Sequence, residues 1–235
     1  MCIRDRFDPT IVVLIPAIIF ALYAQSKVKH AYSKYLRVGN KRGITGRQAA
    51  RMILDANGLG YVPIEMVAGT LTDHYDPKND VMRLSSQVYN GTSIASVSIA
   101  AHESGHAIQD GTAYGFLKFR NAIAPVVSIV STASWPLLII GLFIIWQGNL
   151  STGNFIFNLG VIFFITVVLF HTVTLPVEIN ASRRAVKQLL DLGIIDAGEV
   201  RGAKKVLSAA AMTYVAALAT AVANLVRILL LRGRD

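Results

Sequence analysis

Long stretches without a charged residue dominate the hydrophobic pattern of this chain. They cover residues 9–26, 121–177 and 206–226. A helix needs about 20 mostly apolar residues to span a bilayer, so the first and last stretches fit one helix each. The middle stretch fits two, because the polar run from Gln147 to Asn154 interrupts it as a hairpin loop would. The pattern therefore predicts four transmembrane helices, within residues 7–26, 122–146, 155–177 and 206–231.

The two ends of the chain allow other interpretations. A cleaved signal peptide is the alternative for the first helix, but residues 21–24 lack the small-x-small cleavage pattern, so we interpret it as an anchor. The last helix is rich in alanine and carries Asn224 and Arg227, so it either spans the membrane or lies buried in protein. Residues 1–6 differ in character from everything that follows, and we interpret them as a non-native leader.

Basic residues cluster beside the apolar stretches and predict the orientation of the chain. Residues 27–42 hold six lysines and arginines and no acidic residue, and further basic residues flank the third and fourth helices. Because cytoplasmic loops are enriched in Lys and Arg, residues 27–121 and 178–205 are predicted to be the cytoplasmic segments of a multi-pass cell-membrane protein. Arg232 and Arg234 argue against this orientation for the last helix.

Composition excludes several other classes of protein. The chain is 53% hydrophobic and 16% charged, which is not the balance of a soluble or a disordered protein. Its net charge of +9 is explained by the clusters beside the membrane helices, and no nucleic-acid-binding motif accompanies it, so a nucleic-acid partner is not expected. One cysteine excludes a disulfide framework and a multi-cysteine metal cluster. The predicted partner is the lipid bilayer.

Two helices are predicted in the water-facing segment. Thr45 is a typical N-cap, and the helix that it begins is predicted to end near Asn57. A second helix, capped by Thr92 or Ser93, is predicted over residues 93–109.

A small sheet is predicted between these helices. Short runs at residues 62–67, 70–75 and 81–84 have strand composition, and the turn-forming residues 76–80 separate the last two runs. Because neighbouring runs are joined by short connections, we expect the sheet to be antiparallel.

The second helix carries the motif His102-Glu103-Ser104-Gly105-His106, which is an H-E-x-x-H sequence. Residues four apart share one face of a helix, so both imidazoles can bind one ion. Zinc lowers the pKa of its bound water to about 7, and Glu103 can accept a proton from that water and pass it to a leaving amine. Gly105 is expected to leave room at the metal. The alternative is two histidines that are satisfied by hydrogen bonds in a helical core.

A catalytic zinc site usually has three protein ligands, and Glu178 is the leading candidate for the third. It lies at the predicted cytoplasmic end of the third transmembrane helix, where an acidic residue is costly unless it is paired or binds a metal. The charge pattern places it on the same side of the membrane as the motif. A salt bridge to Arg183 or Arg184 is the alternative role for Glu178.

Five further residues are candidates for the site. His74 and His171 are rival ligands, although a solvated loop position is the simpler interpretation of His74 and a buried hydrogen bond that of His171. Tyr214, Arg183 and Arg184 could each stabilise an oxyanion by a hydrogen bond or by charge. The alternative for the two arginines is contact with water or lipid phosphate.

The motif and the Glu178 segment give this chain a resemblance to a known family. It resembles the YugP-type membrane zinc metallopeptidases of bacteria, also called neutral zinc metallopeptidases. The resemblance extends from Phe7 onward, and the segments that carry it are residues 8–10 (DPT), 71–77 (LTDHYDP), 93–109, 118–121 (KFRN) and 175–185 (LPVEINASRRA). It implies that His102, His106 and Glu178 bind one zinc ion per chain and that Glu103 is the catalytic acid and base.

A more distant similarity, to the HtpX heat-shock protease and the CAAX prenyl-protein protease, concerns the support of the ligands. In those proteins the later glutamate begins an E-x-x-x-D pattern, whose aspartate supports a ligand histidine. Ser182 occupies the aspartate position in this chain and can hydrogen-bond an imidazole more weakly than a carboxylate does.

Pattern and resemblance together predict a mainly α integral membrane protein with a small α+β cytoplasmic metalloprotease domain of the zincin type. The expected function is zinc-dependent endopeptidase cleavage of proteins or peptides, membrane proteins among them, with Glu103 as general base and acid. The alternative is a non-catalytic membrane protein with a structural zinc site. The intact Glu103 argues against it, because a structural site needs no base.

Overall fold

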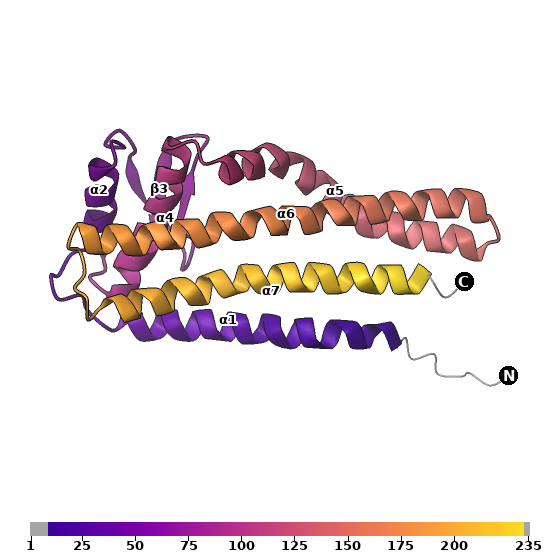
Figure 1. Ribbon diagram of the computed structural model, residues 1–235, viewed down its shortest axis with the longest axis horizontal. Helices are drawn as coiled ribbons and strands as arrows, with labels where there is room; N and C mark the ends of the chain where they lie inside the picture. Colours follow the sequence, from indigo (N-terminus) through magenta and orange to yellow (C-terminus); the bar gives the residue numbers. More distant parts are fainter. Residues whose placement is uncertain (1–8, 233–235) are drawn as a thin grey trace. The chain divides into compact units, whose positions relative to one another are not determined.

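The computed structural model describes residues 9–232, and the chain divides into two compact units. One, called here the helical unit, contains the chain up to Tyr23, Arg120–Val173 and the chain from Val215 onward. The other, called the mixed unit, contains Ala24–Phe119 and Thr174–Tyr214. Most of the described residues are helical, and the mixed unit adds one small sheet (Figure 1). The predicted leader, residues 1–6, lies outside the described residues.

The helices of the mixed unit begin at N-cap residues. α2 (Gly46–Ala56) follows Thr45, whose hydroxyl accepts from the Gln48 N–H while the Gln48 side chain accepts from the Thr45 N–H. These reciprocal bonds form a capping box. α4 (Ile94–Gly111) follows Ser93, whose hydroxyl accepts from the Ser96 N–H. Ser93 rather than Thr92 is therefore the cap of the helix that carries the H-E-x-x-H motif.

The sheet is mixed, so the expectation of an antiparallel sheet is wrong. β1 (Ile64–Val67) runs parallel to β3 (Val81–Ser85), and β2 (His74–Asp76) runs antiparallel to it, in the order β1-β3-β2. β3 takes the centre because it is buried over most of its length, whereas β1 and β2 are half-exposed. Leu71 has a positive φ of 58°, so the run at 70–75 becomes extended only from His74.

The main apolar core of the mixed unit joins its helices to the sheet. α2, α4, β3 and the short α3 (Ser86–Asn90) contribute to it, as do the final turns of α6 (Leu150–Asp191) and the first turns of α7 (Val200–Arg232). Its fully buried side chains include Ile53, Leu54, Met82, Leu84, Val97, Leu189 and Ile194. This core packs α4 against α6, and these are the helices that carry the motif and Glu178.

Within residues 9–232, four helices are long and apolar enough to cross a membrane. They are the N-terminal helix, which comprises η1 (Pro9–Val13) and α1 (Leu14–Leu36), then α5 (Gly115–Trp146), α6 and α7. The most apolar window of α7 is no more buried than that of α5, at 17% in each. This exposure favours a membrane span over the alternative of a helix buried in protein.

The helices extend beyond the apolar stretches that predicted them. α6 continues from Val177 to Asp191, so Glu178 lies within a continuous helix and not at a helix end as expected. A stretch without charges marks the part that suits lipid, whereas backbone hydrogen bonds can continue the same helix into water. The predicted polar loop is also shorter, because the Asn149 side chain accepts from the Thr152 N–H and α6 already begins at Leu150.

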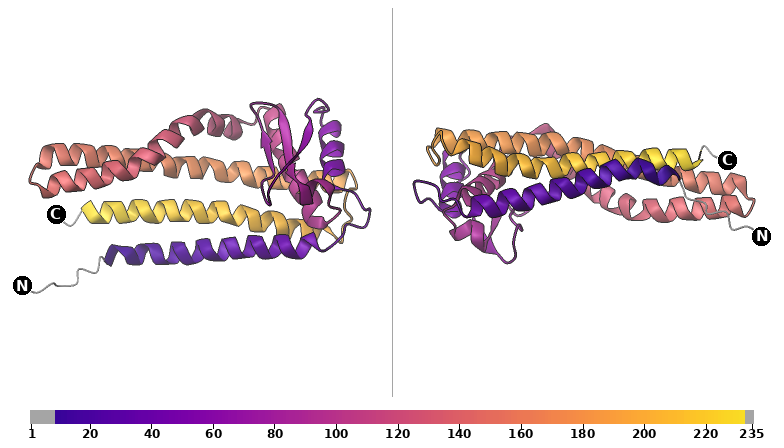
Figure 2. Two further views of the ribbon diagram at one scale, coloured as in Figure 1. Left: turned by 180° about the vertical axis from the view of Figure 1, so that it is seen from behind. Right: turned by 90° about the horizontal axis from the view of Figure 1, so that it is seen from below.

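Within the helical unit, α5 and α6 form a close antiparallel pair (Figure 2). A Cβ atom on Gly141 would lie 2.6 Å from the backbone nitrogen of Phe157. Leu138, Phe157, Val161 and Phe164 fill the contact between these helices. Small residues that allow backbones to approach are typical of helix pairs in membranes.

Candidate metal centre

Two helices of the mixed unit bring three potential metal ligands together. α4 supplies His102 and His106, and α6 supplies Glu178. The Glu178 Oε2 atom lies 3.3 Å from His102 Nε2 and 3.5 Å from His106 Nε2. One ligand atom from each residue lies within 4.8 Å of the other two. Because Glu178 is only 3% exposed, its carboxylate is held away from water and against the two imidazoles.

This set of donor atoms fits zinc. Two neutral imidazoles and one carboxylate are a ligand set of hydrolytic zinc sites, in which the fourth position stays open. Calcium and magnesium prefer oxygen ligands alone. In the part of the chain that the structure describes, neither Arg183 nor Arg184 forms an ion pair with Glu178, so the alternative of a salt bridge to one of these two arginines is not what the structure shows.

Gly105 serves the contact between the two helices. A Cβ atom at this position would lie 2.7 Å from the carbonyl oxygen of Ala181 on α6. The room that Gly105 leaves is filled by the backbone of α6, so the close approach at this residue is between the two helices. This close approach brings Glu178 within reach of the histidines. The packing offsets the roughly 1 kcal/mol by which a glycine destabilises a helix interior.

A buried glutamine determines which nitrogen of His106 faces Glu178. Gln109 is fully buried, and its Nε2 donates to the Val177 carbonyl at 2.8 Å and to Asn180 Oδ1 at 3.0 Å. A carbonyl only accepts, so Gln109 presents its nitrogen to α6 and its oxygen to His106 Nδ1, which lies 3.0 Å away. Nδ1 therefore carries the proton, and Nε2 keeps the lone pair that a metal needs.

Arg184 is the last residue in this series of hydrogen bonds. Its Nε donates to Asn180 Oδ1 at 2.8 Å. Because a guanidinium only donates, the Asn180 oxygen must face both Arg184 and Gln109. The series from Arg184 through Asn180 and Gln109 to His106 ties α6 to α4 by hydrogen bonds. These contacts give Arg184 a structural role, while its oxyanion role stays a prediction.

Replacing Gln109 with leucine is expected to weaken zinc binding by about 10–100-fold, because the orientation and tautomer of His106 would no longer be fixed. The measurement is competition for zinc against a chromophoric chelator. Gln188→Leu is the matched control, since Gln188 lies on α6 and bonds to Asn57, away from the ligands. Equal zinc affinity in the two variants would contradict the role assigned to Gln109.

His102, the other candidate histidine ligand, has a weaker support than His106. Ser182 Oγ lies 3.3 Å from His102 Nδ1. A hydroxyl can accept from this nitrogen and so leave Nε2 free, but it carries no charge to strengthen the bond. Ser182 therefore holds His102 less firmly than an aspartate at this position would.

Glu103 lies beside the ligands in a buried position. It is 9% exposed, and its Oε2 accepts from the backbone N–H of Tyr75 on β2 at 3.1 Å. Burial raises the pKa of Glu103 to about 7; the charge of His102 opposes this rise, and the carboxylates of Glu178 and Asp73 add to it. A carboxylate with such a pKa can both accept and donate a proton near neutral pH.

The sheet is fastened to the motif helix through Tyr75. Its hydroxyl lies 3.0 Å from Asp80 and 3.2 Å from Asp110, and the second of these residues is on α4. This contact and the bond to Glu103 hold β2 against α4, so the tertiary contacts of the strand orient the carboxylate.

Comparison with known proteins agrees with this site. Residues 10–233 match the model of a family described as "Putative neutral zinc metallopeptidase". The chain belongs to this family. It is 47% identical over 223 residues to a protein of Bacillus subtilis (strain 168) named "Putative membrane protease YugP", across 94% of this chain and 96% of that protein. No solved structure matches the chain significantly.

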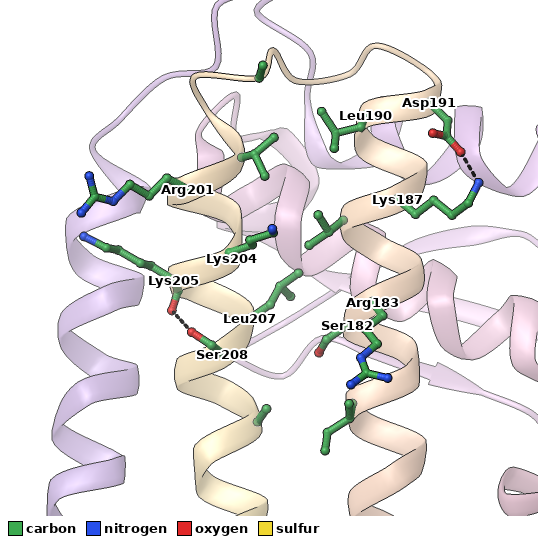
Figure 3. A pocket seen from close by; sticks show the side chains of 15 residues that line it. Ser182, Arg183, Lys187, Leu190, Asp191, Arg201, Lys204, Lys205, Leu207 and Ser208 are labelled. Carbon is green, nitrogen blue, oxygen red and sulfur yellow. Dashed lines mark hydrogen bonds and ion pairs between the residues drawn. The ribbon is translucent and has the colours of Figure 1, made fainter.

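The other candidates from the sequence lie outside the ligand group. His74 is exposed on β2, with its Nδ1 2.8 Å from the Thr72 carbonyl oxygen, and His171 lies on α6 in the helical unit. Among the described residues, the group that could hold a metal contains neither of them. Arg183 is an exposed residue of α6, and Figure 3 shows its side chain at a pocket of the mixed unit. The role of Tyr214 on α7 stays a prediction.

Sequence reasoning named Ser182 beside His102 but missed Gln109, Asn180 and the Tyr75 backbone N–H. Gln109 follows His106 by three residues and so shares its helix face, which is a signal that the sequence already contained. Asn180 and the Tyr75 backbone gave no comparable signal, because their contacts depend on how α6 and β2 pack against α4.

Proposed function

We propose that this protein is a membrane zinc endopeptidase with His102, His106 and Glu178 as zinc ligands and Glu103 as general base and acid. The observation that carries the proposal is the buried His/His/Glu group formed by α4 and α6. Family membership and the similarity to a protein named as a membrane protease support it.

The metal and the residues of the chain have separate roles in the proposed reaction. Zinc, when bound, supplies a Lewis acid that polarises the scissile carbonyl and lowers the pKa of water. Glu103 accepts the proton of the attacking water and returns it to the leaving amine. The Tyr75 N–H holds the Glu103 carboxylate in place, and Gln109 keeps the lone pair of His106 Nε2 directed toward Glu178.

Extended segments are the expected substrates. β2 is an edge strand of the sheet, and its Tyr75 backbone lies next to Glu103. Exposed strand edges bind extended peptides through main-chain hydrogen bonds. Unfolded proteins and unfolded segments of membrane proteins can add an extended segment to such an edge. The strands of folded proteins are already paired within their own sheets.

The site is proposed to face the cytoplasm, as part of a small zincin-like domain. The basic residues in segments 27–121 and 178–205, which hold the whole ligand group, support this orientation. The four apolar helices support a multi-pass arrangement.

Cleavage in sealed membrane vesicles of opposite orientation tests the function, the metal and the orientation together. An unfolded reporter protein added outside is expected to be cut by inside-out vesicles alone, to survive in the presence of a zinc chelator, and to be cut again after zinc is restored. The same reporter in folded form is the control for substrate class. Zinc-loaded protein that cuts nothing in either orientation would contradict the peptidase function, and cleavage by right-side-out vesicles alone would contradict the orientation.

A further inference from the structure

A groove of about 980 Å³ lies within the mixed unit, between α6 and α7 (Figure 3). Aliphatic side chains from both helices line most of its length. They are Ile179, Val186 and Leu190 on α6 and Val200, Leu207 and Ala211 on α7. Such a lining favours a ligand with a hydrocarbon part, because apolar surface gains from removal from water.

Positive charge exceeds negative charge around this groove. Its lining holds five basic residues and one acidic residue, Asp191, which pairs with Lys187 on its own helix. In the described part of the chain, Arg183, Arg201, Lys204 and Lys205 form no ion pair. Figure 3 shows Lys204 directed from α7 toward α6, with Arg183 on the facing helix. These two residues line the groove from facing helices.

The groove coincides with the ends of two apolar stretches. The stretch without charges in α6 ends at Val177, and that in α7 begins at Val206. In a membrane-spanning arrangement, residues at these positions lie at the level of the lipid headgroups. Ile179, Leu207 and Ala211 therefore lie on the hydrocarbon side of the groove. Arg183 and Lys204 lie on its water side, as do Val186, Leu190 and Val200.

Ser182 shows that the groove is separate from the hydrolytic face of the metal centre. It lines the groove, and its hydroxyl lies near His102 Nδ1. The opposite ring nitrogen of His102, Nε2, is the atom that faces Glu178. Neither His102 nor Glu178 lines the groove, which reaches only Ser182 on the Nδ1 side of the ring, so a ligand there does not take the place of a scissile peptide.

We propose that this groove binds an anionic phospholipid, with the phosphate between Arg183 and Lys204 and an acyl chain along Ile179, Leu207 and Ala211. Arginine offers a fork of donors to phosphate oxygens, and lysine adds a second point charge. A lipid chain needs no hydrogen-bond partners, whereas a peptide backbone in the same aliphatic groove would lack partners for its N–H and C=O groups. Charge and shape together therefore favour lipid over peptide.

Binding of phosphatidylglycerol and phosphatidylcholine to the full-length, detergent-purified protein, measured by native mass spectrometry, tests the proposal. Wild type is expected to prefer phosphatidylglycerol. The double variant Arg183→Gln/Lys204→Gln should lose about tenfold or more of its affinity for this lipid, because each basic residue at a membrane surface contributes to anionic-lipid binding. Ala211→Phe should also weaken binding, since it fills the apolar part without a change of charge.

The matched control is Arg201→Gln/Lys205→Gln, which removes the same charge from α7. Figure 3 shows both of these side chains directed away from α6. Equal losses in the two double variants would overturn the proposal in favour of unspecific surface attraction. Displacement of the lipid by inorganic phosphate alone, or by an acidic peptide, would overturn it too, as would a dimer that closes the groove. Zinc content of each variant checks its fold without any use of peptidase activity.

Discussion

Replacing Glu103 with glutamine is expected to abolish most peptide cleavage while about one zinc ion per chain stays bound. General acid–base catalysis contributes about 10²–10⁴-fold to a rate, and glutamine can neither accept nor return a proton at neutral pH. The zinc ligands are unchanged by this substitution. A glutamine oxygen can still accept from the Tyr75 N–H, so β2 should stay against α4.

The measurement pairs elemental analysis with cleavage of an unfolded reporter, on the same preparation. Glu65→Gln is the control, because Glu65 is an exposed carboxylate on β1 whose ion pair with Arg83 lies at the surface. Full activity in Glu103→Gln would remove Glu103 from the mechanism. Zinc-loaded wild type that is as inactive as the variant would favour a structural zinc site instead.

Replacing Glu178 with alanine is expected to empty the metal site, with zinc content falling from about one ion per chain to a small fraction of that value. The side chain is buried between two histidines, and the substitution leaves only two ligands, both from one helix. The loss should exceed the roughly 10–100-fold expected for a residue such as Gln109, which only orients a ligand. Peptide cleavage should disappear together with the zinc.

Glu65→Ala is the control for this substitution, and Glu178→Gln is a second variant that keeps the volume of the buried side chain. Elution of each purified variant as a single species shows that the fold survives. A full zinc content in Glu178→Ala would contradict the ligand group and would make His74 or His171 the third ligand.

The sequence was most informative where one segment fixes the chemistry by itself. The apolar stretches indicated four helices suited to a membrane, because lipid requires about 20 residues without charge whatever they pack against. The spacing of His102 and His106 placed both rings on one helix face, because helix geometry is local. Glu178 could be singled out as well, since a carboxylate beside an apolar helix requires a partner.

Tertiary packing decided the features that involve contacts between segments far apart in the sequence. β3 became the central strand because its burial outweighed the pairing of neighbours, and this made the sheet mixed. The close approach of Gly105 to Ala181 set the reach of Glu178 to the histidines. Gln109 fixed the tautomer of His106 only because α6 presents the Val177 carbonyl to it. Local patterns thus indicated which residues are candidates for the chemistry, whereas the packing of α4 against α6 and β2 determined how those residues are oriented.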